Sequence, residues 1–318
     1  MPPEPNVAPA DIRAAYAVIT PHVRRTPLLE AASPIDGLPS ISLKLECLQH
    51  AGSFKPRGAF HNLLTRAAPP VGCATASGGN HGAAVAYAAG RLGIRARVFV
   101  PEIAAPPKIA KIKAYGAEVV VKGAAYADAQ ALCDCYVAES GALAIHPYAT
   151  AATIAGQGTV GLEWEEDLAR LGLLPIDTAL VAVGGGGLIA GVAAWFEGRI
   201  KGVGVEPQGS RALAAGRPVD VTVNSVAADS LGARSVGELN LRIARRAVDQ
   251  VALVDDAAIR AAQRRLWRDF QIAAEPGGAA AFAAMASGAY RAAPGERVGV
   301  LVCGANVGLE ALAALIDG

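Results

Sequence analysis

The stretch TALVAVGGGGL, residues 178–188, leads from β-branched and apolar residues through a run of glycines into a helical pattern. Residues 178–183 predict a buried strand, and residues 188–197 predict the helix that follows. Consecutive glycines are entropically expensive to order, so we interpret them as a functional loop in preference to a tight packing turn. The backbone N–H groups from Gly184 to Gly187, beside a helix N-terminus, are suited to hold a phosphate group.

The glycine loop by itself does not identify its phosphate ligand. A Walker A loop ends in Gly-Lys-Ser/Thr, whereas this loop ends in Gly187-Leu188, which argues against a nucleoside triphosphate. A dinucleotide is a competing ligand, because Gly185, Gly187 and Ala190 fit the GxGxxA pattern. Glu206, at the end of the next predicted strand, lies where a ribose-binding acid is expected. The loop therefore leaves this choice open.

Short apolar runs alternate with helical patterns over most of the chain. The predicted strands cover residues 71–76, 96–100, 118–122, 142–145, 178–183, 202–205 and 297–302, and the predicted helices cover residues 82–92, 107–115, 126–139, 154–170, 188–197, 257–270 and 277–287. Such alternation predicts parallel sheets covered by helices. Because the pattern restarts after His146-Pro147, we expect an α/β protein with two domains, each a mostly parallel open sheet flanked by helices, and a cleft between them.

The composition indicates a protein that acts on small molecules. Its 29 basic and 28 acidic residues give a net charge of +1, which offers no electrostatic footprint for nucleic acid or an anionic membrane. No stretch reaches the roughly 18 apolar residues of a membrane span, and residues 1–5 lack the features of a secretory signal. The 5 scattered cysteines contain no CxxC pair, which favours reduced thiols in a cytoplasm over disulfides or a zinc site.

Lys55 lies in the run GSFKPRGA, residues 52–59. Ser53 predicts an N-cap for a helix that begins at Phe54, with Pro56 in the first turn, where a missing N–H costs little. Lys55 would then sit at the positive end of the helix dipole, which disfavours an ammonium group and favours a neutral or imine nitrogen. A helix-start lysine with its head in water is the alternative.

Two further loops are candidates for chemistry. SGGNHG, residues 77–82, lies between a predicted strand and a predicted helix, where open amides suit a carboxylate and Asn80 can donate or accept a hydrogen bond. A tight turn capped by Asn80, with His81 bonded to nearby backbone, is the alternative. Cys303 follows the strand over 297–302, which would point its thiol into the cleft; a buried structural cysteine is the alternative.

Taken together, these segments resemble the fold-type II pyridoxal phosphate enzymes of the serine/threonine dehydratase and serine racemase group. The resemblance is carried, in order, by Arg25-Thr26-Pro27-Leu28, Leu43-Lys44-Leu45-Glu46, Gly52 to Ala59, Ser77 to Gly82, Ile154 to Thr159, Gly184 to Gly187, Glu206-Pro207, Glu275-Pro276 and Cys303 to Asn306. It implies a tryptophan synthase β-like fold. Residues 1–66 and 148–318 would form a large cofactor-binding domain, and residues 67–147 a small mobile α/β domain.

The resemblance also implies a role for each site residue. Lys55 would form the Schiff base with the cofactor, Phe54 would pack on its ring, Asn80 would hydrogen-bond its 3-hydroxyl, and Cys303 would face its pyridine nitrogen. The phosphate would be held by Gly184, Gly185, Gly186, Gly187 and Leu188. The substrate carboxylate would be held by Ser77, Gly78, Gly79, Asn80 and His81.

Departures from the family pattern narrow the expected reaction. The racemases of this group have a serine where this chain has Gly78, on the cofactor face opposite the lysine. Without that hydroxyl, no evident second acid reprotonates the opposite face. Cys303 offers the pyridine nitrogen only a neutral thiol, which weakens the electron sink and suits prompt β-elimination. Both features favour elimination over racemisation.

The expected cation site is incomplete. Glu206 matches one ligand of the divalent-metal site of serine racemases, but Ala212 stands where that site needs a second acid. Whether the protein binds a monovalent or a divalent cation therefore stays an open question. Only residues 307–318 follow Asn306, so there is no room for the regulatory domain of biosynthetic threonine dehydratases, and the resemblance is to the short catabolic type.

We therefore expect a lyase that converts L-threonine or L-serine to a 2-oxo acid and ammonia, with Lys55 as the base that removes the α-proton. The alternatives are a dehydratase specific for 3-hydroxyaspartate or phenylserine, and a serine racemase. A nicotinamide dehydrogenase would leave Lys55 and residues 77–82 without a role. The substrate side chain is expected beside Tyr148 and residues 228–234, where Arg234 is either a partner for a second carboxylate or a solvated residue. We expect a cytoplasmic homodimer with a small amino-acid substrate and no nucleic-acid or membrane partner.

Overall fold

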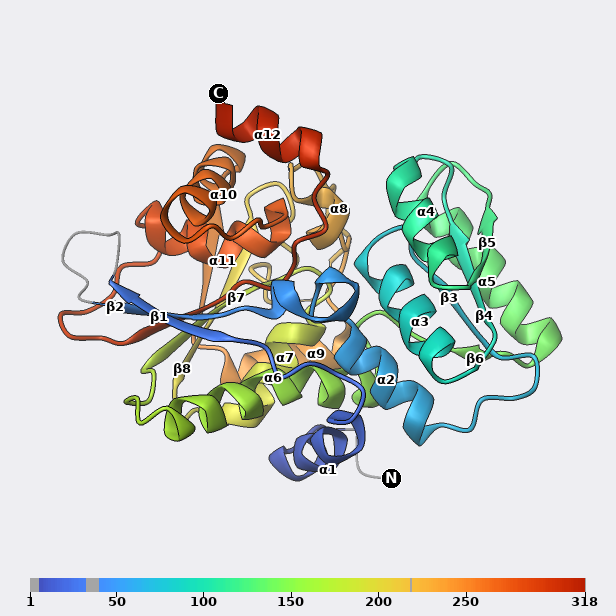
Figure 1. Cartoon of the computed structure of the whole chain (residues 1–318), viewed down its shortest axis with the longest axis horizontal. Helices are drawn as coiled ribbons and strands as arrows, with labels where there is room; N and C mark the ends of the chain where they lie inside the picture. The colour runs from blue at the N-terminus through green and yellow to red at the C-terminus, as the bar shows by residue number, and fades with distance from the viewer. Residues whose placement is uncertain (1–5, 33–39, 218, 318) are drawn as a thin grey trace.

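The computed structural model describes residues 6–32, 40–217 and 219–317. Two α/β units, each built on its own sheet, lie side by side (Figure 1). The larger sheet has the strand order β1-β2-β10-β7-β8-β9, and only the β1–β2 pair is antiparallel among its described strands. Its strands are β1 (Leu28–Ala32), β2 (Ser40–Lys44), β7 (Thr178–Ala182), β8 (Lys201–Pro207), β9 (Gln250–Val254) and β10 (Val298–Leu301).

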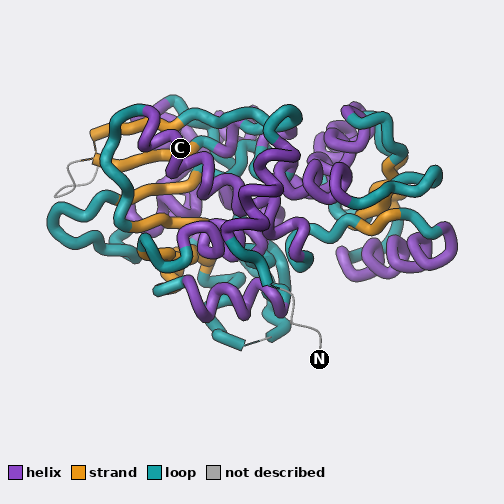
Figure 2. Tube along the Cα trace, turned by 90° about the horizontal axis from the view of Figure 1, so that it is seen from below, coloured by secondary structure: helices purple, strands orange, loops and turns teal. Residues whose placement is uncertain are grey.

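The smaller sheet has the strand order β5-β4-β3-β6, and its pairs are parallel. Its strands are β3 (Cys73–Ala76), β4 (Ala96–Val100), β5 (Glu118–Val121) and β6 (Leu143–Ala144). Figure 2 shows the two sheets as separate groups of strands with helices between them. The predicted α/β class with two mostly parallel sheets is confirmed, whereas the expected domain limits, 1–66 with 148–318 and 67–147, stay a prediction.

Helices cover both faces of the larger sheet (Figure 1). One layer contains α1 (Pro9–Ile19), α6 (Ala151–Arg170), α7 (Gly187–Phe196) and α9 (Glu238–Ala247). The opposite layer contains α10 (Asp256–Phe270) and α11 (Pro276–Ala286), with α8 (Ala228–Leu231) against α11 and α12 (Leu309–Asp317) against α10. Because helices cover both of its faces, β7 is buried along its whole length, as its continuous apolar run predicts.

The smaller sheet is also covered on both faces. α3 (Asn80–Arg91) and α4 (Pro106–Ala114) lie on one face, and α5 (Tyr126–Ser140) lies on the other. Helix α2 (Pro56–Thr65) contacts α3 of this unit and α6 of the larger one, so it connects the two units. Two short 3₁₀ turns, η1 (Glu46–Leu48) and η2 (His50–Gly52), lead from β2 to α2.

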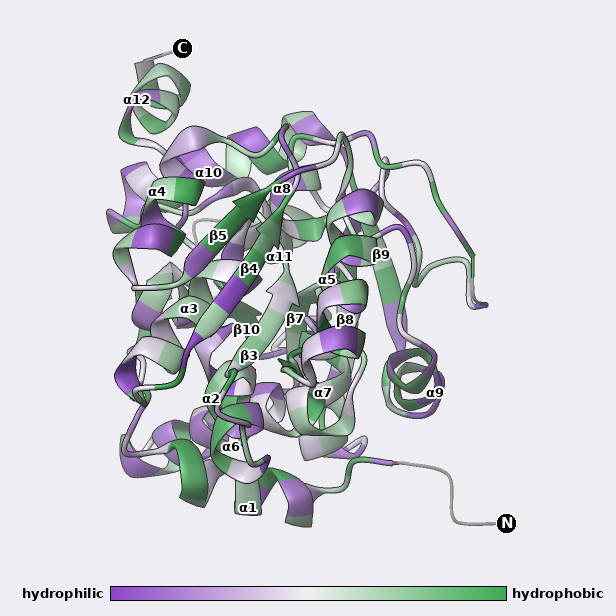
Figure 3. Ribbon diagram, turned by 90° about the vertical axis from the view of Figure 1, so that its right-hand side faces the viewer, coloured by the Kyte–Doolittle hydropathy of each residue, from purple (hydrophilic) through white to green (hydrophobic). Residues whose placement is uncertain are grey.

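Hydropathy differs between the strands and the surface helices. Figure 3 shows hydrophobic residues along β5 and a mixture of hydrophilic and hydrophobic residues around α9. The buried residues of α9 include Leu239, Leu241 and Ile243, so one side of this surface helix packs inward while the other meets solvent. No helix in the described part of the chain has the length and apolar character that crossing a membrane requires.

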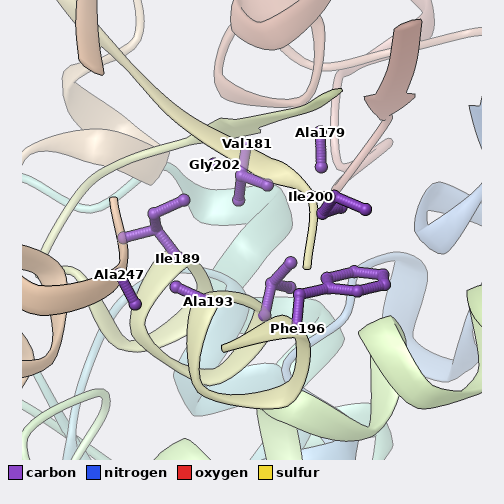
Figure 4. A pocket seen from close by; sticks show the side chains of 9 residues that line it. Ala179, Val181, Ile189, Ala193, Phe196, Ile200, Gly202 and Ala247 are labelled. Carbon is purple, nitrogen blue, oxygen red and sulfur yellow. The ribbon is translucent and has the colours of Figure 1, made fainter. Parts of the chain in front are cut away.

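A small cavity lies inside the larger unit, between β7, β8 and α7 (Figure 4). Its lining is apolar and consists of Ala179, Val181, Ile189, Val192, Ala193, Phe196, Ile200, Gly202 and Ala247. The cavity volume is about 10 Å³, which is at the lower limit for one water molecule. An apolar cavity of this size is a packing gap in the core and offers no functional group to a ligand.

Candidate active site

The strand order places the candidate loops at one edge of each sheet. In the larger sheet β10 lies on one side of β7, and β8 and β9 lie on the other, so the connections reverse at β7. In open parallel sheets such a switch point leaves a crevice at the carboxyl ends of the strands. The loops after β7 and β10 carry Gly184 to Gly187 and Cys303. In the smaller sheet β3 lies between β4 and β6, and the loop after β3 carries residues 77–81.

The segment that holds Lys55 is fixed by backbone contacts and not by the predicted helix cap. Helix α2 begins at Pro56 with Lys55 as its N-cap, so the expected helix start at Phe54 and the capping role of Ser53 are wrong. Ser53 instead forms an isolated antiparallel bridge with Gly304, and the N–H of Phe54 donates to the carbonyl of Cys303 at 3.2 Å. This pairing with a distant loop holds Ser53 extended and buries its side chain, which therefore cannot turn to cap α2.

The amine of Lys55 lies in a low-polarity environment. Its Nζ donates to the carbonyl of Pro147 at 3.0 Å and lies 5.1 Å from the ring centre of Phe54. Burial lowers the pKa of Lys55 to about 8, and the nearby Cys303 and Glu275 oppose this shift only in part. A substantial fraction of Lys55 is therefore a neutral amine near physiological pH, as expected for a nucleophile or a base.

Close neighbours exclude side chains from the glycine loop. A Cβ at Gly185 would lie 2.3 Å from Cδ1 of Tyr148, and Gly186 has a φ of +85°. The side-chain amide of Asn240 donates to the carbonyls of Gly185 and Tyr148 at 2.6 and 3.1 Å. With these carbonyls held and α7 beginning at Gly187, the loop N–H groups form an anion cradle at a helix N-terminus.

Tyr148 connects this cradle to the lysine. It follows Pro147, whose carbonyl accepts the Lys55 hydrogen bond, and its ring packs on Gly185. His146 supports the turn, since its Nδ1 accepts hydrogen bonds from the backbone N–H groups of Tyr148 and Ala149 at 3.2 and 2.9 Å. The expected position of Tyr148 beside the substrate side chain stays a prediction.

The loop after β3 supplies backbone N–H groups and the side-chain amide of Asn80. The N–H of Gly79 donates to Oγ of Ser77 at 3.2 Å, and α3 begins at Asn80. The Nε2 of His81 lies 3.0 Å from the carbonyl of Ile145. Burial, reinforced by Lys55, lowers the pKa of His81 to about 3, so its imidazole is neutral and engaged with backbone. Any contact of His81 with a carboxylate would therefore come from its backbone N–H.

The thiol of Cys303 is held neutral. It is buried at the end of β10 and donates to the carbonyl of Gly277 at 3.5 Å. Burial raises its pKa well above the usual range of a thiol, and the negative charge of Glu275 adds to this shift. A neutral thiol at this place is consistent with the weak hydrogen-bond partner expected from the sequence.

Glu275 is a site residue to which the sequence analysis assigned no role. It is the N-cap residue of α11, it is buried, and its Oε1 accepts a hydrogen bond from Nδ2 of Asn80 at 2.5 Å. Burial raises its pKa, while Asn80 and the lysines Lys108 and Lys111 oppose the shift. A glutamate directly before Pro276 in an otherwise apolar, small-residue stretch was the signal available in the sequence.

A buried ion network anchors the chain on both sides of the lysine. Nζ of Lys44, the last residue of β2, lies 2.8 Å from both Glu163 and Asp167 of α6. Arg57, two residues after Lys55, lies 2.7 Å from Glu46 and 2.9 Å from Glu163. Glu163 therefore joins the two halves of this network. Removing one partner of such a buried pair typically costs about 3–5 kcal/mol, so the network holds α2 firmly against α6.

Two expected residues have partners outside the loops described above. The oxygens of Glu206 accept hydrogen bonds from the backbone N–H groups of Leu213 and Ala214 at 2.7 and 2.8 Å, and burial raises its pKa to about 7. Within residues 6–32, 40–217 and 219–317, no group of His, Cys, Asp and Glu is arranged to hold a metal ion. The metal role of Glu206 stays a prediction. Arg234 is exposed and pairs with Asp220 at 2.5 Å, which matches the solvated alternative.

Comparison with known proteins adds to this geometry. A family model described as pyridoxal-phosphate dependent enzyme matches residues 19–304. A phenylserine dehydratase of Ralstonia pickettii is 38% identical over 299 residues, covering 89% of this chain and 88% of that protein. The structure of maize serine racemase superposes with a TM-score of 0.87 at 33% identity and covers 98% of both chains. The structure of a threonine deaminase from T.th. has a TM-score of 0.86 at 36% identity, covering 96% of this chain and 99% of its own.

Proposed function

Because this chain belongs to the family of pyridoxal-phosphate dependent enzymes, we propose that it is an ammonia-lyase that dehydrates a β-hydroxy amino acid to a 2-oxo acid and ammonia. L-threonine and L-serine are the proposed substrates. The observation that carries the proposal is the partly neutral amine of Lys55, with its pKa of about 8, at the meeting of the glycine loop, Cys303 and the loop over 77–81.

The residues present fit this cofactor. The backbone N–H groups from Gly184 to Gly187, at the N-terminus of α7, suit the phosphate. In the proposed arrangement Lys55 would hold the aldehyde end of the cofactor, Cys303 would face the pyridine nitrogen and Asn80 would contact the 3-hydroxyl. Pyridoxal phosphate supplies an electron sink for charge that develops at the α-carbon of an amino acid.

Lys55 is the proposed acceptor of the α-proton. Its hydrogen bond to the carbonyl of Pro147 directs the amine, and its lowered pKa keeps part of it unprotonated. The loop after β3 offers no second amine: Gly78 has no side chain, the imidazole of His81 is neutral and bonded to Ile145, and the hydroxyl of Ser77 is bonded to the N–H of Gly79. A proton removed by Lys55 therefore has no evident donor among these residues that could return it to the opposite face. This supports elimination over racemisation.

Phenylserine is the second candidate substrate. The phenylserine dehydratase of Ralstonia pickettii is 38% identical to this chain, and the ring of Tyr148 beside Gly185 offers an aromatic surface to a phenyl group. The case for 3-hydroxyaspartate is weaker, because Arg234 is engaged with Asp220 at the surface. A serine racemase remains the alternative of a different reaction class.

A substrate panel tests the proposal. Purified protein saturated with pyridoxal phosphate is incubated with L-serine, L-threonine, phenylserine and 3-hydroxyaspartate, and 2-oxo acid, ammonia and the D-isomer are measured. We expect 2-oxo acid from serine and threonine in excess over D-isomer. More D-serine than pyruvate would overturn the choice of elimination, and no product from any β-hydroxy amino acid would overturn the substrate class.

We also infer a homodimer. Light scattering on the purified protein gives the mass directly, and a single-chain mass at micromolar concentration would contradict the inference. The bound cation and the cytoplasmic location stay predictions. Activity measured after chelation, and after exchange of potassium for lithium, tests whether a cation is needed.

A further inference from the structure

Four side chains form a continuous hydrogen-bonded chain between the two units. Glu275, at the start of α11, accepts from Nδ2 of Asn80 at 2.5 Å. Oδ1 of Asn80 accepts from Nδ2 of Asn306 at 2.6 Å, and Oδ1 of Asn306 accepts from Nζ of Lys111 at 2.5 Å. Asn80 begins α3 and Lys111 belongs to α4, whereas Glu275 and Asn306 belong to the larger unit. The chain of hydrogen bonds thus crosses between the two units three times.

The two ends of this hydrogen-bonded chain, Glu275 and Lys111, determine the orientation of the side-chain amides of Asn80 and Asn306. A carboxylate accepts hydrogen bonds and an ammonium only donates them, so Glu275 must face an NH₂ group and Lys111 must face an amide oxygen. Asn80 therefore presents Nδ2 to Glu275, which leaves Oδ1 for Asn306. Asn306 presents Oδ1 to Lys111 and Nδ2 to Asn80. The orientation that Glu275 requires of Asn80 and the orientation that Lys111 requires of Asn306 are compatible. Flipping either amide would place two acceptors or two donors opposite each other.

The backbone beside Lys55 supports this orientation. The carbonyl of Ala51 accepts from Nδ2 of Asn306 at 2.9 Å and from Nζ of Lys111 at 3.2 Å. Ala51 has a φ of 56°, which is unfavourable for a residue with a side chain, and a Cβ at Gly52 would lie 2.5 Å from Oδ1 of Asn306. The lysine segment therefore adopts a strained turn that presents one carbonyl to both groups and leaves space for Asn306.

We propose that Lys111 and Glu275 are positioning residues, which through Asn306 fix the amide of Asn80 so that it donates a hydrogen bond to the 3-oxygen of the cofactor. The NH₂ group of Asn80 has two hydrogens, and Glu275 takes one of them. The second is available to a ligand in the cleft. The inference rests on the proposed cofactor contact of Asn80 and does not depend on the substrate. Because Lys111 is on α4, it also makes the orientation of Asn80 depend on contact between the two units.

Replacement of Lys111 tests the proposal. Lys111→Met keeps much of the length and the apolar stem of the side chain and removes its donors, while Lys113→Met is the matched control, because Lys113 is exposed on the same helix. The readouts are the fraction of bound cofactor that absorbs in the visible, the cofactor Kd and kcat/KM. We expect Lys111→Met to lower the visible fraction and to reduce kcat/KM about tenfold, the equivalent of one charge-assisted hydrogen bond, mainly through kcat. Lys113→Met should match the wild type.

A double-mutant cycle with Asn306→Ala shows whether Lys111 acts through Asn306. If it does, the double variant is no worse than Asn306→Ala alone. The proposal would be overturned if the losses of kcat/KM in the two single variants were fully additive. It would also be overturned if the fraction of bound cofactor that absorbs in the visible were the same in Lys111→Met and Lys113→Met. If Lys111→Met does not fold, Asn306→Ala with Lys111 intact gives the answer, because an unchanged visible fraction there also overturns it. The spectral readout needs no substrate, so it stays informative even if the panel disproves the proposed substrate class.

Discussion

The carboxyl edges of the two sheets are built in different ways. On the larger sheet, Lys55, the glycine loop and Cys303 are held mostly by backbone bonds, such as the pairing of Ser53 with Gly304. On the smaller sheet, Asn80 finds both side-chain partners, Glu275 and Asn306, on the other unit. The carboxyl edge of the larger sheet, the larger edge, is therefore preformed by its own fold, whereas that of the smaller sheet, the smaller edge, is completed only by contact between the units. We therefore expect substitutions on the larger edge to abolish chemistry or cofactor binding, and those on the smaller edge to act on substrate binding or, through Asn80, on the orientation of the bound cofactor.

The largest expected effect is that of Lys55→Ala, on the larger edge. Loss of a positioned general base typically lowers kcat by about 10²–10⁴, and loss of the cofactor attachment point adds to this. Turnover assays with L-serine and L-threonine measure the change. Borohydride treatment followed by mass spectrometry should label the wild type at residue 55 and leave Lys55→Ala unlabelled. Labelling of the variant at another lysine would show that the amine has been misassigned.

The lowered pKa of Lys55 also predicts how the stability of the apoprotein depends on pH. The folded-state pKa of about 8 lies below the unfolded value of 10.5, so the unfolded chain binds more protons between these limits. The free energy of unfolding should therefore rise from pH 8 to pH 10.5 by about 2–3 kcal/mol from this group. Urea unfolding of the apoprotein across this range checks the rise. Lys55→Met should lack this contribution and be more stable near pH 7. If the free energy of unfolding changed with pH in the same way in both proteins, the lowered pKa of Lys55 would be refuted.

The two glycine-rich loops can be compared directly by adding one methyl group to each. In Gly185→Ala the new Cβ would lie 2.3 Å from the ring of Tyr148, so we expect about 1–3 kcal/mol of destabilisation and at least tenfold weaker cofactor binding. In Gly79→Ala the nearest atom is the carbonyl oxygen of Asp229 at 3.2 Å, so cofactor affinity should change little while KM rises. Cofactor titration and steady-state kinetics separate the two. If Gly185→Ala and Gly79→Ala bound the cofactor with equal affinity, the proposed difference between the two edges would be wrong.

The smallest expected effect concerns reaction outcome at Gly78. A Cβ there would lie 2.8 Å from Cβ of Ala104, so Gly78→Ser is best made together with Ala104→Gly, which opens the space. The added hydroxyl supplies a proton donor on the smaller edge, and we expect the ratio of D-serine to pyruvate to rise a few-fold. Chiral chromatography of the products measures this ratio, with Ala104→Gly alone as the control. An unchanged ratio would show that the hydroxyl at this place does not limit racemisation.

Most helices and strands were predictable because they bury a continuous apolar run or stripe. Strand β4 and the residues of β7 agree with the predicted runs, and α10 starts one residue before the predicted helix. Strands β1 and β2 were not predicted, because LLEAA and SISLK are short segments without a long apolar run. β9 and α9 were also missed, since QVALV and the amphipathic ELNLRIARRA lie in a stretch without clear boundary signals.

The sequence by itself determined the chemistry-bearing loops. A strand, a run of small residues and a helix start are local features, and they located Gly184 to Gly187, residues 77–82 and Lys55 before any contact was known. Tertiary structure decided how these loops are held. Ser53 pairs with Gly304 in place of capping a helix, and Asn80 bonds Glu275, which is 195 residues away along the chain. Local patterns record the conformation of a few neighbouring residues, whereas a hydrogen bond between distant side chains exists only after the sheets and helices have packed.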